Sequence, residues 1–273
     1  MANVDAEIIT HYEQGKEQDR LEMTPAGRLE LLRTQTLLRS ALPVPPAKVL
    51  DVGGGAGRYA AWLAGMGYEV ELIDAVPLHV EQARAVADAL EDATFTAELG
   101  DARRLARADE TFDAVLVLGP LYHLPRADDR ARALAEARRV LRPGGLLAAA
   151  AISRFASTMD GLLRDLLVDE GFRTICRSDL ATGEHRNPER RKGYFTTAYF
   201  HRPEALREEL SGAGFADVDV RAVEGFAGLF SDLAVRLDDP PRRSVLLDTL
   251  ALVDDEPALL GASFHLLGLA HRR

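Results

Sequence analysis

Short apolar runs alternate along most of the chain with longer segments in which apolar residues recur at helical spacing. Runs of the first kind are typical of β-strands buried on both faces, and segments of the second kind are typical of helices with one buried side. Because strand and helix alternate, the pattern predicts a parallel sheet covered by helices on both faces. The predicted strands lie at 49–52, 68–73, 93–99, 112–118 and 146–152, with helices at 77–90 and 127–141 between them.

The alternation changes at both ends of this region. Two helices are expected ahead of the sheet, at 4–18 and 25–41, and an amphipathic helix around 159–167 is followed by a polar loop at 177–194. Sheet-forming elements then return, as a helix at 203–210 and strands at 216–223 and 262–270. The chain therefore divides into an N-terminal helical cap at 1–47, a core at 48–152, a helical and loop insertion at 153–201 that acts as a lid, and a C-terminal part of the core at 202–273 with a helical insertion at about 226–257.

The most informative segment follows the first predicted strand, in which Asp51 is the last residue but one. Glycines occupy positions 53, 54, 55 and 57, directly before the next apolar segment. Glycine tolerates positive φ and lets a ligand lie against bare main chain, while the first N–H groups of a following helix attract an anionic group. The segment therefore predicts a strand–turn–helix that binds a nucleotide-type cofactor.

The spacing of these glycines separates two classes of cofactor. A dinucleotide-binding turn has the pattern Gly-x-Gly-x-x-Gly/Ala, in which the third small residue packs helix against strand. Arg58 occupies that third position here, which argues against NAD and leaves an NAD-dependent oxidoreductase as the weaker alternative. The remaining pattern, Asp-x-Gly-x-Gly-x-Gly from Asp51 to Gly57, resembles the first motif of class I S-adenosylmethionine-dependent methyltransferases.

Two later acids extend this resemblance, which covers residues 48–152. Asp74 ends the second predicted strand and Asp101 follows the third, and in the family such acids accept the ribose hydroxyls and the adenine amino group. The resemblance implies an α/β fold, a doubly wound, mostly parallel seven-stranded sheet of the Rossmann-like type whose last strand is antiparallel. It also implies S-adenosylmethionine as the cofactor, with S-adenosylhomocysteine as the product. The cofactor-binding residues that it implies are Asp51, Gly53, Gly54, Gly55, Gly57, Asp74, Asp101, Ala102 and Leu118.

The segment after the fourth predicted strand supplies the candidates for catalysis. Its sequence, Leu-Gly-Pro-Leu-Tyr-His-Leu at 118–124, resembles a stretch found in a subgroup of bacterial methyltransferases of the small-molecule type. His123 is the best candidate for a general base, which a hydroxyl acceptor generally needs and a neutral amine often does not. Tyr122 is the second catalytic candidate, and the alternative is that both residues only pack beside the cofactor.

The predicted N-terminal helices offer two further candidates for the cofactor site, Tyr12 and Arg33. Related enzymes often fold an N-terminal helix across the cofactor, so the resemblance implies that this tyrosine and this arginine meet its methionine end. An arginine can pair with a carboxylate there through two hydrogen bonds. The alternative is a surface tyrosine and a solvated arginine on an amphipathic helix.

Composition narrows the class of acceptor. The formal net charge of −10 argues against a nucleic-acid substrate, because a phosphate backbone is bound mainly by a basic surface. A small-molecule acceptor is therefore expected, beneath a lid above the carboxyl ends of the strands. The loop at 184–192 is locally basic, and it either guides a carboxylate or phosphate of the acceptor or is simply solvated. The sequence leaves the acceptor atom (oxygen, nitrogen or carbon) and the oligomeric state open.

Other classes of protein find little support. No apolar run approaches the roughly 20 residues that cross a bilayer, and the N-terminus lacks the basic flank and apolar run of a signal peptide. Cys176 is the single cysteine, so no disulfide within the chain is expected, a cytoplasmic location is favoured, and the thiol is expected to be inert. The seven histidines show no metal-ligand spacing, so no metal is expected, and a Gly-x-Ser-x-Gly hydrolase turn is absent. A non-catalytic S-adenosylmethionine-binding protein remains the other alternative.

Overall fold

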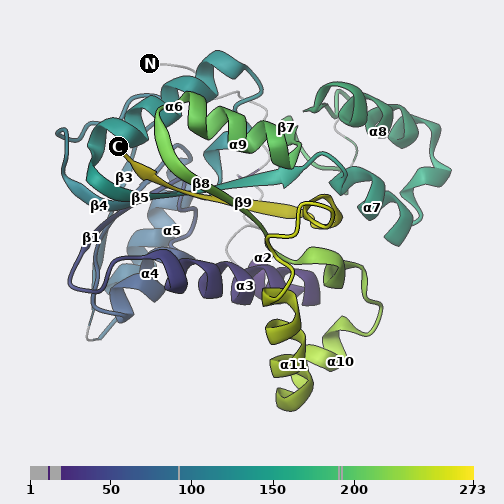
Figure 1. Ribbon diagram of the computed structural model, residues 1–273, viewed down its shortest axis with the longest axis horizontal. Helices are drawn as coiled ribbons and strands as arrows, with labels where there is room; N and C mark the ends of the chain where they lie inside the picture. The colour runs from purple at the N-terminus through teal and green to yellow at the C-terminus, as the bar shows by residue number, and fades with distance from the viewer. Residues whose placement is uncertain (1–11, 13–19, 92, 190, 192) are drawn as a thin grey trace.

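The computed structural model describes residues 12, 20–91, 93–189, 191 and 193–273. Most of the helix predicted at 4–18 therefore lies outside the described residues. The described elements form three layers, with a central sheet between two groups of helices (Figure 1). This arrangement is the α/β architecture that the alternating pattern predicts.

The central sheet has nine strands within the described residues, of which two short ones belong to the lid. The other seven are β1 (Lys48–Val52), β2 (Glu69–Asp74), β3 (Phe95–Leu99), β4 (Phe112–Val117), β5 (Leu141–Ser153), β8 (Phe215–Ala222) and β9 (His265–Arg272). Their order is β3-β2-β1-β4-β5-β9-β8. The first five run parallel to one another, whereas β9 runs antiparallel to both β5 and β8. The predicted doubly wound sheet with an antiparallel last strand is confirmed.

Helices cover both faces of this sheet. One face carries α3 (Pro25–Ala41), α4 (Arg58–Gly65) and α5 (Pro77–Asp88), and the other carries α6 (Ala127–Val140) and α9 (Pro203–Gly212) (Figure 1). Successive side chains of a strand point to opposite faces, so Val49 packs in one apolar core and Leu50 in the other. The two cores hold the strands rigidly, and with them the carboxyl edge of the sheet where ligands bind in such folds.

The lid at 153–201 differs in part from its predicted secondary structure. It contains α7 (Ala156–Leu163), η2 (Leu166–Val168), α8 (Glu170–Thr182), β6 (Glu184–His185) and β7 (Ala198–His201). The polar loop predicted from residue 177 is wrong over its first part, because α8 continues to Thr182 and ends where Gly183 adopts a φ of 85°. β7 pairs in parallel with the end of β5, with Ile152 opposite Phe200, so the lid is anchored to the sheet.

The insertion near the C-terminus packs against the N-terminal part of the chain. It contains η3 (Gly225–Leu229), α10 (Leu233–Asp238), α11 (Pro240–Ala251) and η4 (Leu260–Ala262), and α2 (Arg20–Met23) precedes α3. Leu29 of α3 is fully buried in an apolar cluster with Leu233 and Leu237 of α10. The helices α10 and α11 project away from the sheet next to α3 (Figure 1). The last strand begins at His265 rather than at residue 262, because η4 occupies the preceding residues.

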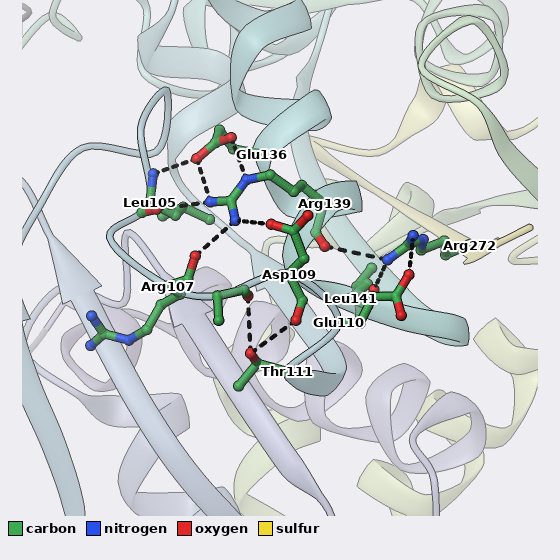
Figure 2. Close-up of polar contacts among 10 residues, drawn as sticks. Leu105, Arg107, Asp109, Glu110, Thr111, Glu136, Arg139, Leu141 and Arg272 are labelled. Atoms are coloured by element: carbon green, nitrogen blue, oxygen red, sulfur yellow. Dashed lines mark hydrogen bonds and ion pairs between the residues drawn. The ribbon is translucent and has the colours of Figure 1, made fainter.

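Arg139 of α6 fixes the segment that connects β3 to β4 (Figure 2). Its guanidinium donates hydrogen bonds of 2.7–2.9 Å to four groups, the carboxylates of Glu136 and Asp109 and the carbonyls of Leu105 and Arg107. The hydrogen bonds to Glu136 and Asp109 hold the pKa of Arg139 well above its ordinary value. Because this segment starts at the carboxyl end of β3, its attachment to α6 also steadies one side of the candidate site.

Candidate functional site

The glycine-rich turn between β1 and α4 has the backbone that its sequence predicts. Gly53, Gly55 and Gly57 have φ angles of 73°, 58° and 86°, a region that residues with side chains rarely adopt. A Cβ atom at Gly53 would lie 2.6 Å from the ring of Pro120, so this position also requires glycine for space. The turn therefore presents bare main chain at the carboxyl edge of the sheet.

Asp74, the last residue of β2, supports this turn from the neighbouring strand. Its carboxylate accepts hydrogen bonds from the main-chain N–H groups of Gly55 (2.9 Å) and Val76 (2.8 Å). Nδ1 of His79, in the first turn of α5, lies 3.1 Å from the same carboxylate. His79 is absent from the residues predicted for the site, although its place one helical turn after Val76 is a local signal that could have found it.

A cavity of about 740 Å³, which we call the first cavity, opens between the carboxyl ends of β1 to β4. Its walls include Asp74, Asp101, Ala102 and His123. Both carboxylate oxygens of Asp101 accept hydrogen bonds from Arg103. Burial would raise the pKa of Asp101, but these hydrogen bonds outweigh it and hold the pKa below its ordinary value. The first cavity thus carries two predicted cofactor acids on neighbouring strands.

The second cavity, of about 770 Å³, lies on the other side of the glycine turn. Gly53, Gly55 and Tyr122 line both cavities, so the two meet at the turn. The second cavity also contains Asp51 and Leu118, which lie at the ends of β1 and β4. A ligand that passes over the turn would place one end in each cavity.

Asp51 has the most unusual environment of the predicted acids. Its side chain is fully buried, and neither carboxylate oxygen has a hydrogen-bond partner among the described residues. Burial, with a smaller contribution from the charge of Asp74, raises the pKa of Asp51 from 3.8 to about 7. A buried carboxyl without a partner at the wall of a cavity is suited to bind a cationic group, which would supply the missing interaction.

Four charged side chains form a cluster at one end of the second cavity, which we call the charged quartet. Arg20, Glu30 and His265 line the cavity, and Glu224 pairs with His265. Arg20 donates two hydrogen bonds to the Glu30 carboxylate, at 2.7 and 2.8 Å. Nδ1 of His265 lies 2.5 Å from Oε1 of Glu224 and 3.8 Å from Oε2 of Glu30. Each acid of the quartet therefore lies beside a basic group.

The ionisation of the quartet follows from these contacts. Burial opposes the charge of His265, yet Glu30 and Glu224 together raise the pKa of its imidazole to about 9. Burial likewise opposes the charge of Glu30, but Arg20 and His265 lower the pKa of its carboxyl to about 2. At neutral pH His265 is therefore an imidazolium and Glu30 a carboxylate.

The same cluster offers the closest approach to a metal site among the described residues. Glu30, Glu224 and His265 each place one ligand-type atom within 4.8 Å of the others. These atoms already contact one another and Arg20 as ion pairs, so their charges are compensated. The absence of a metal stays a prediction. The quartet escaped the sequence analysis because its members are too distant in the chain to form a spacing motif.

The two predicted catalytic residues lie in η1 (Pro120–His123), which follows β4. Nε2 of His123 lies 2.6 Å from the hydroxyl of Tyr12, whose ring is also edge-on to His79 with centroids 5.0 Å apart. Tyr12 and His123 line the first cavity, whereas Tyr122 lines both and donates a hydrogen bond of 3.1 Å to the Leu118 carbonyl. The structure therefore places Tyr12 on the side of Asp74 and Asp101, and Tyr122 at the junction.

Arg33 is not brought to either cavity, and the expectation that it binds the cofactor is corrected here. Its side chain is fully buried and pairs with Asp254 at 2.5 Å, while its Nε donates to the Val223 carbonyl at 3.2 Å. The physical reason is that this face of α3 packs against the C-terminal insertion, which the helical pattern of 25–41 cannot reveal. Arg20, four residues before the helix, lines the second cavity instead.

The basic loop at 184–192 has acidic partners where it is described; Arg190 and Lys192 lie outside the described residues. Arg191 pairs with Asp169 at 2.8 Å and with Glu189 at 2.7 Å, and Arg186 lies 3.5 Å from Glu184. These pairs reduce the positive field available to an acceptor, which favours the solvated alternative. Within the lid, burial raises the pKa of the Cys176 thiol to about 11, in agreement with an inert cysteine.

Comparison with known proteins decides the family. Residues 49–145 match a family described as a methyltransferase domain. The methyltransferase GfsG of Streptomyces halstedii is 39% identical over 133 residues, which are 47% of this chain and 45% of that protein. The ubiquinone/menaquinone biosynthesis C-methyltransferase UbiE of a Bradyrhizobium species is 33% identical over 186 residues, which are 66% of this chain and 70% of that protein. The chain belongs to the S-adenosylmethionine-dependent methyltransferases.

This methyltransferase also has the fold of its family. An S-adenosylmethionine-dependent methyltransferase from Methanosarcina mazei matches it with a TM-score of 0.59 at 18% identity, over 86% of this chain and 96% of that chain. Membership of this family, rather than the likeness in fold, gives S-adenosylmethionine as its cofactor. The chain spans less than half the length of the first curated relatives that it matches. Within the described ranges, every helix is too short or too polar to cross a membrane.

Proposed function

We propose that this methyltransferase transfers the methyl group of S-adenosylmethionine to a small-molecule acceptor that enters the second cavity. The observation that carries the proposal is the junction of the two cavities at the glycine turn. A cofactor that passes over the turn would have its methyl-bearing sulfur at this junction, where an acceptor in the remaining part of the second cavity could meet the methyl carbon in line. The bound cofactor supplies an electrophilic methyl group on a positively charged sulfur, and the protein binds, orients and excludes water.

The residues of the first cavity suit the adenosine half of the cofactor. Asp74 would accept the ribose hydroxyls, and Asp101 with the neighbouring Ala102 would meet the adenine edge. The second cavity suits the amino-acid half, because the buried carboxyl of Asp51 lacks a partner that an ammonium group would provide. The guanidinium of Arg20, which lines the same cavity, would then face the carboxylate. The glycine turn lies between the two halves.

A small molecule fits this arrangement better than a polymer. The proposed site consists of cavities between the strand ends and the flanking segments rather than an open surface, and the net charge of −10 disfavours a phosphate backbone. UbiE is named as a C-methyltransferase, whereas a similar protein of Geobacter sulfurreducens is named as a malonyl-[acyl-carrier protein] O-methyltransferase, so the family relationship leaves the acceptor atom open. Tyr122 lines the junction where the acceptor would meet the methyl group, which supports its place near the reaction.

His123 keeps two possible roles in this proposal. As a general base it would accept a proton from the acceptor; as a structural partner of Tyr12 it would hold the N-terminal segment over the cofactor. The variant His123→Ala separates them. If His123 is the base, the variant should lose turnover and keep its affinity for S-adenosylhomocysteine. If His123 is a structural partner, the variant should lose this affinity.

The first test is calorimetric titration with S-adenosylhomocysteine, NADH and 5′-methylthioadenosine, which lacks the amino-acid half of the cofactor. We expect S-adenosylhomocysteine to bind, NADH not to bind, and 5′-methylthioadenosine to bind more weakly. Arg20→Ala should reduce this preference for S-adenosylhomocysteine, while Arg126→Ala, an arginine with a 77% exposed side chain outside both cavities, should not. Binding of NADH alone would refute the proposal, and binding of S-adenosylhomocysteine would justify a screen of hydroxyl, amine and carbon acceptors for methyl transfer.

A further inference from the structure

His265 lines the second cavity and forms an acid–histidine pair with Glu224. Nδ1 of His265 donates to Oε1 of Glu224 at 2.5 Å. The other carboxylate oxygen, Oε2, accepts hydrogen bonds of 2.9 Å from the Ser263 hydroxyl and from the main-chain N–H of His265. The carboxylate is thus fixed by three donors, and it selects the imidazole tautomer that carries its proton on Nδ1. The lone pair of neutral His265 is then on Nε2.

The position of His265 places this imidazole beside the site of transfer. His265 is the first residue of β9 and pairs with Ile152 near the carboxyl end of β5. Because side chains alternate along a strand, it lies on the same face of the sheet as Leu267, and both line the second cavity. Tyr122 and Leu118 line this cavity as well, from the side of β4. An acceptor between these walls would meet both His265 and the junction of the cavities.

His123 is less well placed for the same task. It lines the first cavity together with Asp74 and Asp101, where the adenosine half of the cofactor is proposed to lie. Its Nε2 is already 2.6 Å from the Tyr12 hydroxyl. An acid–histidine pair is also the usual arrangement of a base that must take a proton from a hydroxyl group, because the acid orients the ring and stabilises the imidazolium that forms.

We propose that His265 is the general base of this methyltransferase, that Glu224 is its positioning residue, and that the acceptor reacts through a hydroxyl group. This inference rests on the proposed function and specifies its acceptor chemistry. The acceptor oxygen forms a bond to the methyl carbon while the bond between that carbon and sulfur breaks, and the electron pair of the broken bond remains on sulfur. The hydroxyl proton passes to Nε2 of His265, and solvent later removes it from the imidazolium.

The charges around His265 determine how this base responds to pH. Glu224 follows β8, Glu30 comes from α3, and both favour the imidazolium, whereas Arg20 from α2 disfavours it. In the protein without ligand these groups place the pKa of His265 at about 9, so activity should rise with pH through the neutral range. A cationic ligand in the second cavity should lower this pKa, because it adds a positive charge near the ring.

The test compares two ligands that differ in charge at the reacting atom. S-adenosylmethionine carries a fixed positive charge on sulfur, and S-adenosylhomocysteine lacks both this charge and the methyl group. We would titrate each histidine of the protein by NMR in both complexes, with His265→Gln and Glu224→Gln used independently to assign the His265 signal. The pKa of His265 should be lower in the S-adenosylmethionine complex by on the order of two units, as expected for a charge ~6 Å away at an effective dielectric constant of about 20.

His271 provides the matched control, because it is exposed on the same strand and does not line the second cavity. Its pKa should be the same in both complexes. A larger shift at His123 than at His265, or no shift at His265, overturns the inference. If neither ligand binds, the proposed function itself fails, so the two failures are distinct.

Measurement of kcat tests the chemical role of His265. With any hydroxyl acceptor found in the screen, His265→Gln should lower kcat by roughly 10²- to 10⁴-fold without weakening S-adenosylhomocysteine binding. Glu224→Gln should retain part of the activity and move the pH profile toward lower pH, because it removes a charge that favours the imidazolium. An unchanged kcat in His265→Gln would exclude this histidine as the base.

Discussion

The buried carboxylate of Asp51 should destabilise the folded protein above neutral pH, where it is ionised and available to bind a ligand. Its pKa is 3.8 in an unfolded chain and about 7 in the folded protein, a difference that corresponds to roughly 4 kcal/mol at 1.36 kcal/mol per unit. Since the folded state binds this proton more tightly, the stabilising contribution is complete below pH 3.8 and is lost as the pH rises through about 7. The variant Asp51→Asn keeps the shape of the side chain and removes the charge, so it should be more stable than the natural protein at pH 8.

Urea denaturation at pH 8 and pH 4 measures this effect. At pH 8 the free energy of unfolding should be higher in Asp51→Asn by up to roughly 4 kcal/mol, and at pH 4 the two proteins should be nearly equal. Asp113→Asn is the control with the opposite sign, because hydrogen bonds from Lys48 and Arg142 outweigh burial and lower the pKa of Asp113. That variant should be less stable at pH 8. Equal or lower stability of Asp51→Asn at pH 8 would refute the argument that Asp51 is buried without a partner.

The same variant connects stability to binding. If Asp51 pairs with the ammonium group of the cofactor, S-adenosylhomocysteine should bind more tightly as the pH rises through 7, and this dependence should disappear in Asp51→Asn. Between pH 6 and pH 8, ionisation of a group with a pKa of about 7 rises from about one tenth to about nine tenths, so the affinity should increase by on the order of tenfold. Calorimetric titration at pH 6 and pH 8 tests this increase in affinity. A pH-independent affinity in the natural protein would show that Asp51 does not bind the ammonium group.

Three further substitutions test separate parts of the structure. Arg33→Ala should lower the free energy of unfolding by about 3 kcal/mol, because it leaves the carboxylate of Asp254 buried without its closest partner. It should leave the affinity for S-adenosylhomocysteine unchanged, and a tenfold loss of affinity would return Arg33 to the cofactor site. Arg139→Ala should lower the free energy of unfolding by about 2 kcal/mol and speed amide hydrogen exchange at 105–111, and slow exchange there would show that the segment has other supports. Tyr12→Phe removes the hydroxyl that contacts His123 at 2.6 Å and should raise the dissociation rate of S-adenosylhomocysteine about fivefold in stopped-flow measurements. An unchanged rate would show that this contact does not help to retain the cofactor.

The parts of the site that sequence predicted are those built by neighbours along the chain. The turn at Gly53 to Gly57 requires positive φ at three glycines, and the same residues carry the motif, so local sequence determines both conformation and family. Asp74 and Asp101 were found because each follows an apolar strand, and parallel strands bring their carboxyl ends to one edge. These inferences need no knowledge of distant contacts.

The parts that sequence missed depend on packing between distant segments. The helical pattern of α3 shows which residues are buried, but it cannot show that Arg33 meets Asp254 in the C-terminal insertion. Glu30 and His265 likewise come together only because α3 crosses the start of β9. The polar composition of α8 concealed the second half of this helix, because only three of its residues, Phe172, Cys176 and Asp179, are buried. Tertiary contacts, rather than local preference, determine the first two.

The second cavity has consequences for how relatives of this protein should be compared. Arg20 and Glu30 precede the segment that matches the methyltransferase family, and Val223 and His265 follow it, yet all four line the same cavity. Most of the residues proposed for the cofactor therefore lie in the matched core, while the two flanking regions supply Arg20 for the cofactor and much of the wall that an acceptor would meet. Substrate preference can diverge through these flanks without any change in the core, so relatives that share the core can differ in acceptor. A chimera that exchanges both flanks together should take on the acceptor preference of the donor protein. The exchange of one flank alone should give a cavity whose two sides do not match, and it should not transfer this preference.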